Sequence, residues 1–200
     1  MDDTPVKTAR SARTALLYMT RAAVIAALYA AVTMALPEFS YGPLQVRFSE
    51  ALTLLPAVLP EAVPGLFVGC FAANILSSYG PLDMVFGSLA TLSAALLTRL
   101  IFKTLIAKKE NLKWLAYAAA ALPPVLINAV VIGAVIAFSD AYTPDGGLNM
   151  VIFRAVYLPT ALSVGAGQSI ACFGLGAPLL AGFRKVLKRG LALPPAGGEQ

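Results

Sequence analysis

The sequence predicts an all-α integral membrane protein, one domain of six transmembrane helices with both termini in the cytoplasm. The first reason is composition: 58% of the 200 residues are hydrophobic and 12% are charged, whereas soluble domains average about 45–50% and about 25%. A soluble chain of this length has too much surface for its volume to bury so many apolar side chains. The second reason is that basic residues separate long apolar runs.

Most of the apolar runs approach or exceed the roughly 20 residues that cross a bilayer, and the first five stop at a recognisable breaker. Pro37 ends the first run, Pro56 shortens the second because proline removes a backbone donor, and the turn sequence SSYGP follows the third. The stretch AKKENLK ends the fourth, and SDAYTPDGGLN ends the fifth. The sixth is long enough to bend at its glycines. The predicted spans are 15–36, 44–59, 64–79, 82–106, 113–138 and 150–183.

The basic residues give the orientation of these spans. All 15 of them except Arg47 and Arg154 lie near the start of the first span, the end of the fourth or the end of the sixth. Cytoplasmic segments carry an excess of Lys and Arg, so these three regions face the cytoplasm. We therefore expect a multi-pass protein of the cell membrane, with a membrane domain over 14–186 between cytoplasmic tails 1–13 and 187–200.

Several kinds of chemistry are excluded. The chain has no histidine, which removes Ser-His-Asp catalysis and the zinc motif HExxH, and it has no GxxxxGK[ST] nucleotide loop. Its two cysteines, Cys70 and Cys172, lie in apolar runs without metal-ligand spacing. We expect no enzyme activity, no metal and no cofactor. The net charge of +5 is divided between apolar runs, so we expect no nucleic-acid partner.

Polar side chains gather toward the outer ends of the predicted spans, where each costs up to roughly 2.5–3.5 kcal/mol. Such residues usually face the protein interior or a water-filled cavity. We predict a binding pocket open to the outside. Arg47 and Glu50, three residues apart, would share a helix face there; the alternatives are a salt bridge between these two and ordinary interhelical hydrogen bonds for the amides. The candidate residues are Gln45, Arg47, Glu50, Asn74, Asp83, Asn128 and Gln168.

Small residues form a stripe along the first span. Ala22, Ala26 and Ala30 recur every four residues, and the next residue after each is also alanine. Stripes of this kind let another helix approach closely. The neighbour is either a helix of the same bundle or a separate membrane partner.

Several motifs in a fixed order resemble the QueT family. They cover roughly residues 18–183 and read GPLQVRFSEALTLLP, PGLFVGCFAANILSS, DMVFGSLATLSAALLT, ALPPVLINAVVIG and VGAGQSIACFGLGAPL. The resemblance implies a six-helix substrate-binding (S) component of an energy-coupling factor (ECF) transporter, an ABC-type importer. Such a component captures a queuosine precursor, a 7-deazaguanine base, from the extracellular side. It delivers the base together with a transmembrane coupling protein and two cytosolic ATPases.

The resemblance also implies that Ala22, Ala26 and Ala30 dock on the coupling protein. The donors and acceptors of such a base suggest roles for the polar residues. We expect Glu50 to bind its guanine-like edge and Asp83 to face a cationic aminomethyl group. The orienting residues would be Gln45, Arg47, Asn74 and Asn128.

One position departs from the family pattern. Gln168 stands where the family often has Glu, which removes a partner for a cationic ligand. A nitrile-bearing or uncharged precursor, or another purine-like base, therefore stays open. The alternatives in function are an S component for another small vitamin or base, and a stand-alone secondary carrier; the lack of a detectable internal repeat counts against the carrier.

Overall fold

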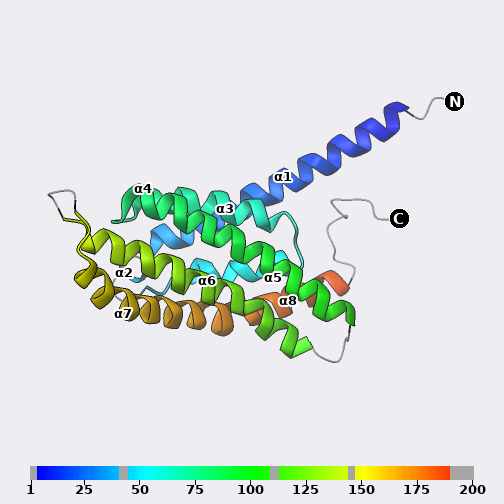
Figure 1. Ribbon diagram of the computed structural model, residues 1–200. Coiled ribbons are helices and arrows are strands. Elements are labelled where there is room, and N and C mark those ends of the chain that lie inside the picture. The colour runs from blue at the N-terminus through cyan, green and yellow to red at the C-terminus, as the bar shows by residue number, and fades with distance from the viewer. Residues whose placement is uncertain (1–3, 41–44, 109–112, 144–146, 190–200) are drawn as a thin grey trace.

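The computed structural model describes residues 4–40, 45–108, 113–143 and 147–189 (Figure 1). These residues form a helical bundle, with an isolated β-bridge between Tyr142 and Leu148. The α-helices are α1 (Thr4–Ala35), α2 (Pro37–Ser40), α3 (Ala62–Ala73), α4 (Gly80–Leu82), α5 (Ser88–Lys108), α6 (Lys113–Ala141), α7 (Met150–Ser169) and α8 (Ala177–Lys188). The 3-10 helices are η1 (Phe48–Ala57) and η2 (Asn74–Leu76), and the π-helices are η3 (Asp83–Gly87) and η5 (Ile170–Gly176).

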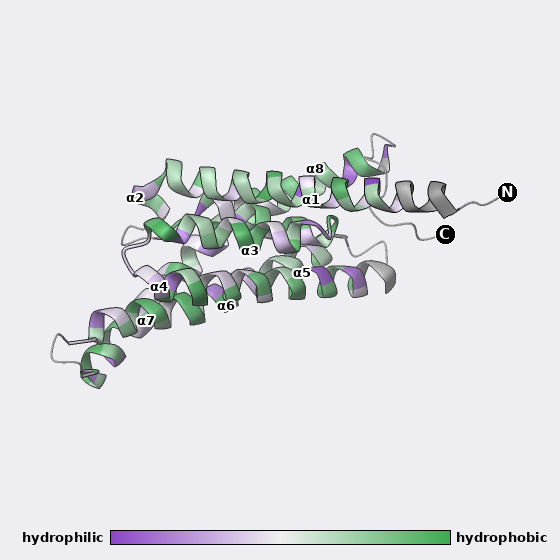
Figure 2. Cartoon of the chain, turned by 90° about the horizontal axis from the view of Figure 1, so that it is seen from above, coloured by the Kyte–Doolittle hydropathy of each residue, from purple (hydrophilic) through white to green (hydrophobic). Residues whose placement is uncertain are grey.

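Four stretches of the described chain are long and apolar enough to cross a membrane. Figure 2 shows hydrophobic residues along most of the helices, and large side chains such as Val151 stay exposed, in that case at 78%. An apolar exterior of this kind suits lipid and not water. The structure is therefore that of an all-helical membrane protein, and its four candidate spans correspond to the first, fourth, fifth and sixth predicted ones. They are Ser11–Ala35, Gly80–Leu105, Trp114–Ala141 and Met150–Leu187.

The predicted second span, 44–59, differs from the structure. Its central part is η1, a 3-10 helix of 10 residues, which is about 20 Å long at about 2.0 Å per residue, against a hydrocarbon core of about 30 Å. Proline at position 56 lacks the donor that a longer α-helix needs. Non-α-helical backbone is tolerated at membrane depth where protein surrounds it, and most η1 side chains are buried. The predicted third span, 64–79, forms the shorter apolar helix Ala62–Leu76.

The first and last helices extend beyond the predicted membrane domain, 14–186. Helix α1 begins at Thr4, inside the stretch 1–13 that was predicted to be a tail, because its alanine, lysine and arginine residues are strong helix formers. Figure 1 shows this part of α1 extending beyond the bundle. At the other end α8 continues to Lys188, and residues 190–200 of the predicted tail 187–200 lie outside the described residues.

The short helix η1 lies at the centre of the core. Leu54 belongs to one buried hydrophobic cluster with residues of α5, α6 and α8, and Leu55 belongs to another with residues of α1, α3 and α5. On a further side α7 packs directly on the backbone that leads into η1. A Cβ atom on Gly167 would lie 2.0 Å from the carbonyl oxygen of Gln45, so only glycine permits this approach. The enclosure fixes the position of the polar residues that η1 carries.

Close packing of α1 on α3 determines the direction of the alanine stripe. A Cβ on Gly65 or Gly69 of α3 would lie 2.6 Å from the carbonyl oxygen of Ala22 and 2.7 Å from that of Ala26. Ala26 is accordingly buried, and Ala22 and Ala30 are half-buried. The structure thus turns this stripe toward α3, whereas the neighbouring stripe is exposed. The exposed residues are Ala23, Ala27 and Ala31.

Helix α6 passes through two prolines without ending. Pro124 cannot donate to the carbonyl of Ala120 one turn earlier, and Thr98 of α5 donates its hydroxyl to that carbonyl at 2.8 Å. The freed carbonyl is therefore satisfied by a neighbouring helix, as membrane burial requires. One turn further along α6, Asn128 faces the interior.

Candidate ligand-binding site

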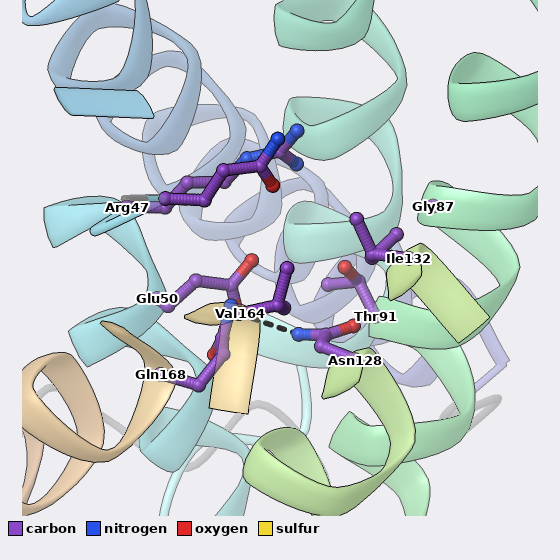
Figure 3. Close-up of a pocket in the computed structure, with 9 residues that line it drawn as sticks. Arg47, Glu50, Gly87, Thr91, Asn128, Ile132, Val164 and Gln168 are labelled. Atoms are coloured by element: carbon purple, nitrogen blue, oxygen red, sulfur yellow. Dashed lines mark hydrogen bonds between the residues drawn. The ribbon is translucent and has the colours of Figure 1, made fainter. Parts of the chain in front are cut away.

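A pocket with an empty volume of about 260 Å³ lies between η1, the start of α5, α6 and α7 (Figure 3). Its walls combine one guanidinium, one carboxylate, three amides from separate segments and a few small or apolar groups. This mixture of a few polar groups among apolar ones is typical of small-molecule sites. The lining residues are Gln45, Arg47, Glu50, Gly87, Thr91, Asn128, Ile132, Val164 and Gln168.

Glu50 is the carboxylate of the pocket, and its side chain is held by neutral donors. The residue is 1% exposed. The Tyr29 hydroxyl of α1 donates to Oε1 at 2.5 Å, and the Asn128 amide of α6 donates to Oε2 at 3.3 Å. Gln168 of α7 lies beside the same carboxylate in Figure 3. Three helices thus orient one acidic group toward the pocket.

Arg47 forms its described ion pair with Asp83 and not with Glu50. The Arg47 Nη2 to Asp83 Oδ2 distance is 3.0 Å, and the two side chains are 5% and 0% exposed. Ser77 donates its hydroxyl to the same oxygen at 2.6 Å, and Arg47 Nε donates to the Ser40 carbonyl at 3.3 Å. The sequence argument placed Arg47 and Glu50 on one helix face. Arg47 instead has an extended backbone just before η1, so helical spacing does not apply to it.

The structure brings five of the seven predicted residues to the pocket: Gln45, Arg47, Glu50, Asn128 and Gln168. The other two, Asn74 and Asp83, are fully buried and do not line it. They lie next to each other behind its wall, where the Asn74 amide donates to the Asp83 backbone carbonyl at 2.9 Å.

Other residues of the site were not among the predictions. Tyr29 lies on the inward face of α1, four residues before Thr33, whose hydroxyl lies 2.6 Å from that of Ser49 next to Glu50. A hydroxyl on each of two successive turns of an apolar helix was the signal that marks this face. Gly87 gave no such signal because it has no side chain, although it lines the pocket.

The geometry can now be compared with known families. A family model described as QueT transporter matches residues 19–185. The chain belongs to the QueT transporter family. The match covers every residue that lines the pocket and confirms the family to which the sequence motifs pointed. A search of curated proteins and a search of solved structures find no match.

Membership of QueT gives the general role of the chain. QueT is a transporter family and not a family of enzymes, as the lack of catalytic motifs predicted. A transporter of this family is embedded in the membrane and takes a small-molecule substrate. For a QueT protein, the buried pocket around Glu50 is the candidate place for that substrate.

Proposed function

We propose that this QueT chain is the S component of an ECF-type importer and captures a 7-deazaguanine base from the extracellular side. The observation that carries the proposal is the buried carboxylate of Glu50, which opens on a pocket flanked by the amides of Asn128 and Gln168. A guanine-like ring presents adjacent N–H donors, and a carboxylate accepts two such bonds side by side. Arg47, Gln45 and the amide donors are placed to bond the ring carbonyl.

A 7-deazaguanine base is a flat bicyclic ring. The apolar side chains of Ile132 and Val164 provide surfaces on which such a ring can pack.

We further propose the six-segment topology, with both termini in the cytoplasm. The six segments would be the four long spans, the segment made of η1 and its flanks, and the helix Ala62–Leu76. The last two are short and would cross the bilayer only as parts of the bundle. Figure 1 shows the first turns of α1 and the last turns of α8 toward the same end of the molecule, and the end of α6 and the start of α7 toward the opposite end. The ends of α1, α5 and α8 nearest the chain ends are rich in basic residues, which supports a cytoplasmic location.

The partners of an S component are a coupling protein in the membrane and two cytosolic ATPases, since the chain has no nucleotide loop of its own. We place the docking of the coupling protein on α1. Of the two alanine stripes, the predicted one, Ala22–Ala26–Ala30, packs toward α3, so we assign the contact to the exposed stripe formed by Ala23, Ala27 and Ala31.

Calorimetric titration of the detergent-purified protein tests the proposed substrate class. We expect tight binding of 7-aminomethyl-7-deazaguanine or its nitrile counterpart. Glu50→Gln should weaken binding by tenfold or more, because a charge-assisted bond contributes about 1.5–3 kcal/mol. Glu38→Gln is the matched control, since this carboxylate is exposed on α2 and should leave the affinity unchanged. A folded Glu50→Gln protein that binds normally would contradict the assignment.

An S component for another small vitamin or purine-like base remains the second candidate. The neutral Gln168 in the pocket favours it, because this amide can both donate to and accept from an uncharged ring. Binding of guanine or another base without any binding of a deazaguanine would select this alternative. A stand-alone carrier would purify without ATPases.

A further inference from the structure

A cluster of one guanidinium and three aromatic rings joins α5, α6 and α8, away from the pocket. The Cζ atom of Arg184 in α8 lies 5.8 Å from the centre of the Phe102 ring in α5, within the range of cation–π attraction. Its Nη1 atom lies 3.5 Å from the Tyr117 hydroxyl of α6. Phe102 and Tyr117 are buried and stack with their ring centres 5.8 Å apart. Three helices thus fix the position of one cationic group.

Trp114 indicates the depth of this cluster in the membrane. Its ring meets the Tyr117 ring edge-on, with the centres 5.7 Å apart, and the residue is 77% exposed. An indole that faces outward on a membrane protein lies at the level of the lipid headgroups, because its ring is apolar and its N–H is polar. Since Tyr117 contacts both Trp114 and Arg184, the guanidinium lies close to the same level.

The helices that form the cluster are basic near it. Lys103 and Lys185 directly follow Phe102 and Arg184 in the sequence, and both lysines are exposed. Neither α5 nor α8 contains an acidic residue, and the acidic residue of α6, Asp140, lies in the last turn of that helix. Basic side chains between helices at headgroup level are a recurrent means of binding anionic lipids.

We propose that this cluster is a binding site for an anionic phospholipid. Arg184, Lys103 and Lys185 hold the headgroup phosphate, for which the planar guanidinium has a matching geometry. The Phe102 ring holds the guanidinium in place before the lipid arrives, so little side-chain freedom is lost on binding.

Apolar surface for the acyl chains lies beside these charges. Phe183 and Val186 of α8 flank Arg184 and Lys185 in the sequence and are exposed at 38% and 49%. In the proposed topology the lipid belongs to the cytoplasmic leaflet. The site is independent of the substrate, because none of its residues lines the pocket.

Tryptophan fluorescence tests the site directly, because Trp114 is the only tryptophan of the chain. The full-length protein is reconstituted in phosphatidylcholine vesicles that contain increasing fractions of phosphatidylglycerol or phosphatidylcholine with brominated acyl chains, which quench a nearby indole. A basic residue near an anionic membrane surface raises affinity about fivefold. Brominated phosphatidylglycerol should therefore reach half-maximal quenching at a fraction about tenfold lower than brominated phosphatidylcholine does. Equal quenching by the two lipids would overturn the site and leave the basic surface to a protein partner.

A double variant then connects the preference to the lysines. Lys103→Gln/Lys185→Gln should reduce the preference for phosphatidylglycerol to about twofold or less, since two of the three cations are gone. Arg154→Glu is the control, because it lowers the net charge by the same amount on an exposed residue near the start of α7, at the opposite end of the molecule from the last turns of α8 (Figure 1). A preference that survives in the double variant, or that falls equally in the control, overturns the assignment. Should the double variant not fold, the comparison of the two lipids in the unaltered protein decides.

Discussion

Asp83→Asn is expected to destabilise the protein strongly, although it replaces one side chain by another of nearly the same shape. The amide can still accept a hydrogen bond from Ser77, so the change removes the charge and little else. Arg47 is 5% exposed and would keep its positive charge without the carboxylate that compensates it. Breaking a buried ion pair by removing one partner costs about 3–5 kcal/mol.

The size of the effect can be read from thermal unfolding in detergent. For a chain of 200 residues, each kcal/mol shifts Tm by about 2–4 °C, so Asp83→Asn should lower Tm by about 6–20 °C. The double variant Arg47→Met/Asp83→Asn should recover most of this loss, because the uncompensated guanidinium is gone. Glu61→Gln is the matched control: its partner Arg21 is 16% exposed and can turn to solvent, so the loss should be smaller.

Two outcomes would refute this reasoning. The first is a Tm for Asp83→Asn within about 2 °C of the unaltered protein, which at about 2–4 °C per kcal/mol leaves at most about 1 kcal/mol for the pair. The second is a double variant that is less stable than the single one, which would mean that Arg47 supports the fold through contacts other than the ion pair.

Two further predictions concern α6 and α1. Thr98→Val in α5 leaves the carbonyl of Ala120 in α6 unpaired and should lower the free energy of unfolding by about 1–3 kcal/mol. Thr104→Val, at an exposed position of α5, should not lower it. Chemical or thermal unfolding of both variants tests this difference. Ala27→Phe places a ring on the exposed stripe and should abolish co-purification of the coupling protein and ATPases without changing ligand affinity. Ala155→Phe, exposed on α7, should leave the complex intact, and an unaffected complex in both variants would remove α1 from the docking surface.

The sequence predicted the long spans well because lipid imposes one simple requirement on them. A run of about 20 apolar residues has to form a helix when no water is present to bond its backbone, and α1, α5, α6 and α7 follow that rule. The same rule gives no answer for 44–59, where the apolar content is similar but the backbone is enclosed by protein. Whether such a segment becomes an α-helix or the 3-10 helix η1 depends on neighbours that hydropathy does not reveal.

The candidate site was predictable in its residue types and not in its pairings. Glu50 and Asn128 attract attention because polar groups are rare in apolar runs. The partner of Arg47 was not predictable, because Asp83 lies 36 residues away and helical spacing points to Glu50. Tyr29 is a different case, since a tyrosine in a membrane helix is explained equally well as an interfacial anchor. Only its contact with Glu50 distinguishes the two roles.

The short helix η1 also limits the order in which the chain can mature during synthesis. The helix is about 20 Å long, from the 3-10 rise per residue, and it carries the acidic residue Glu50. For both reasons it is a poor candidate for insertion into lipid on its own. Thr53 of η1 lies against Cys172 of η5, which is synthesised 119 residues later. At about 5–20 residues per second, that interval lasts roughly 6–24 s. During this time the nascent segment has to wait at the membrane interface or within the insertion machinery, and the pocket closes only when η5 arrives.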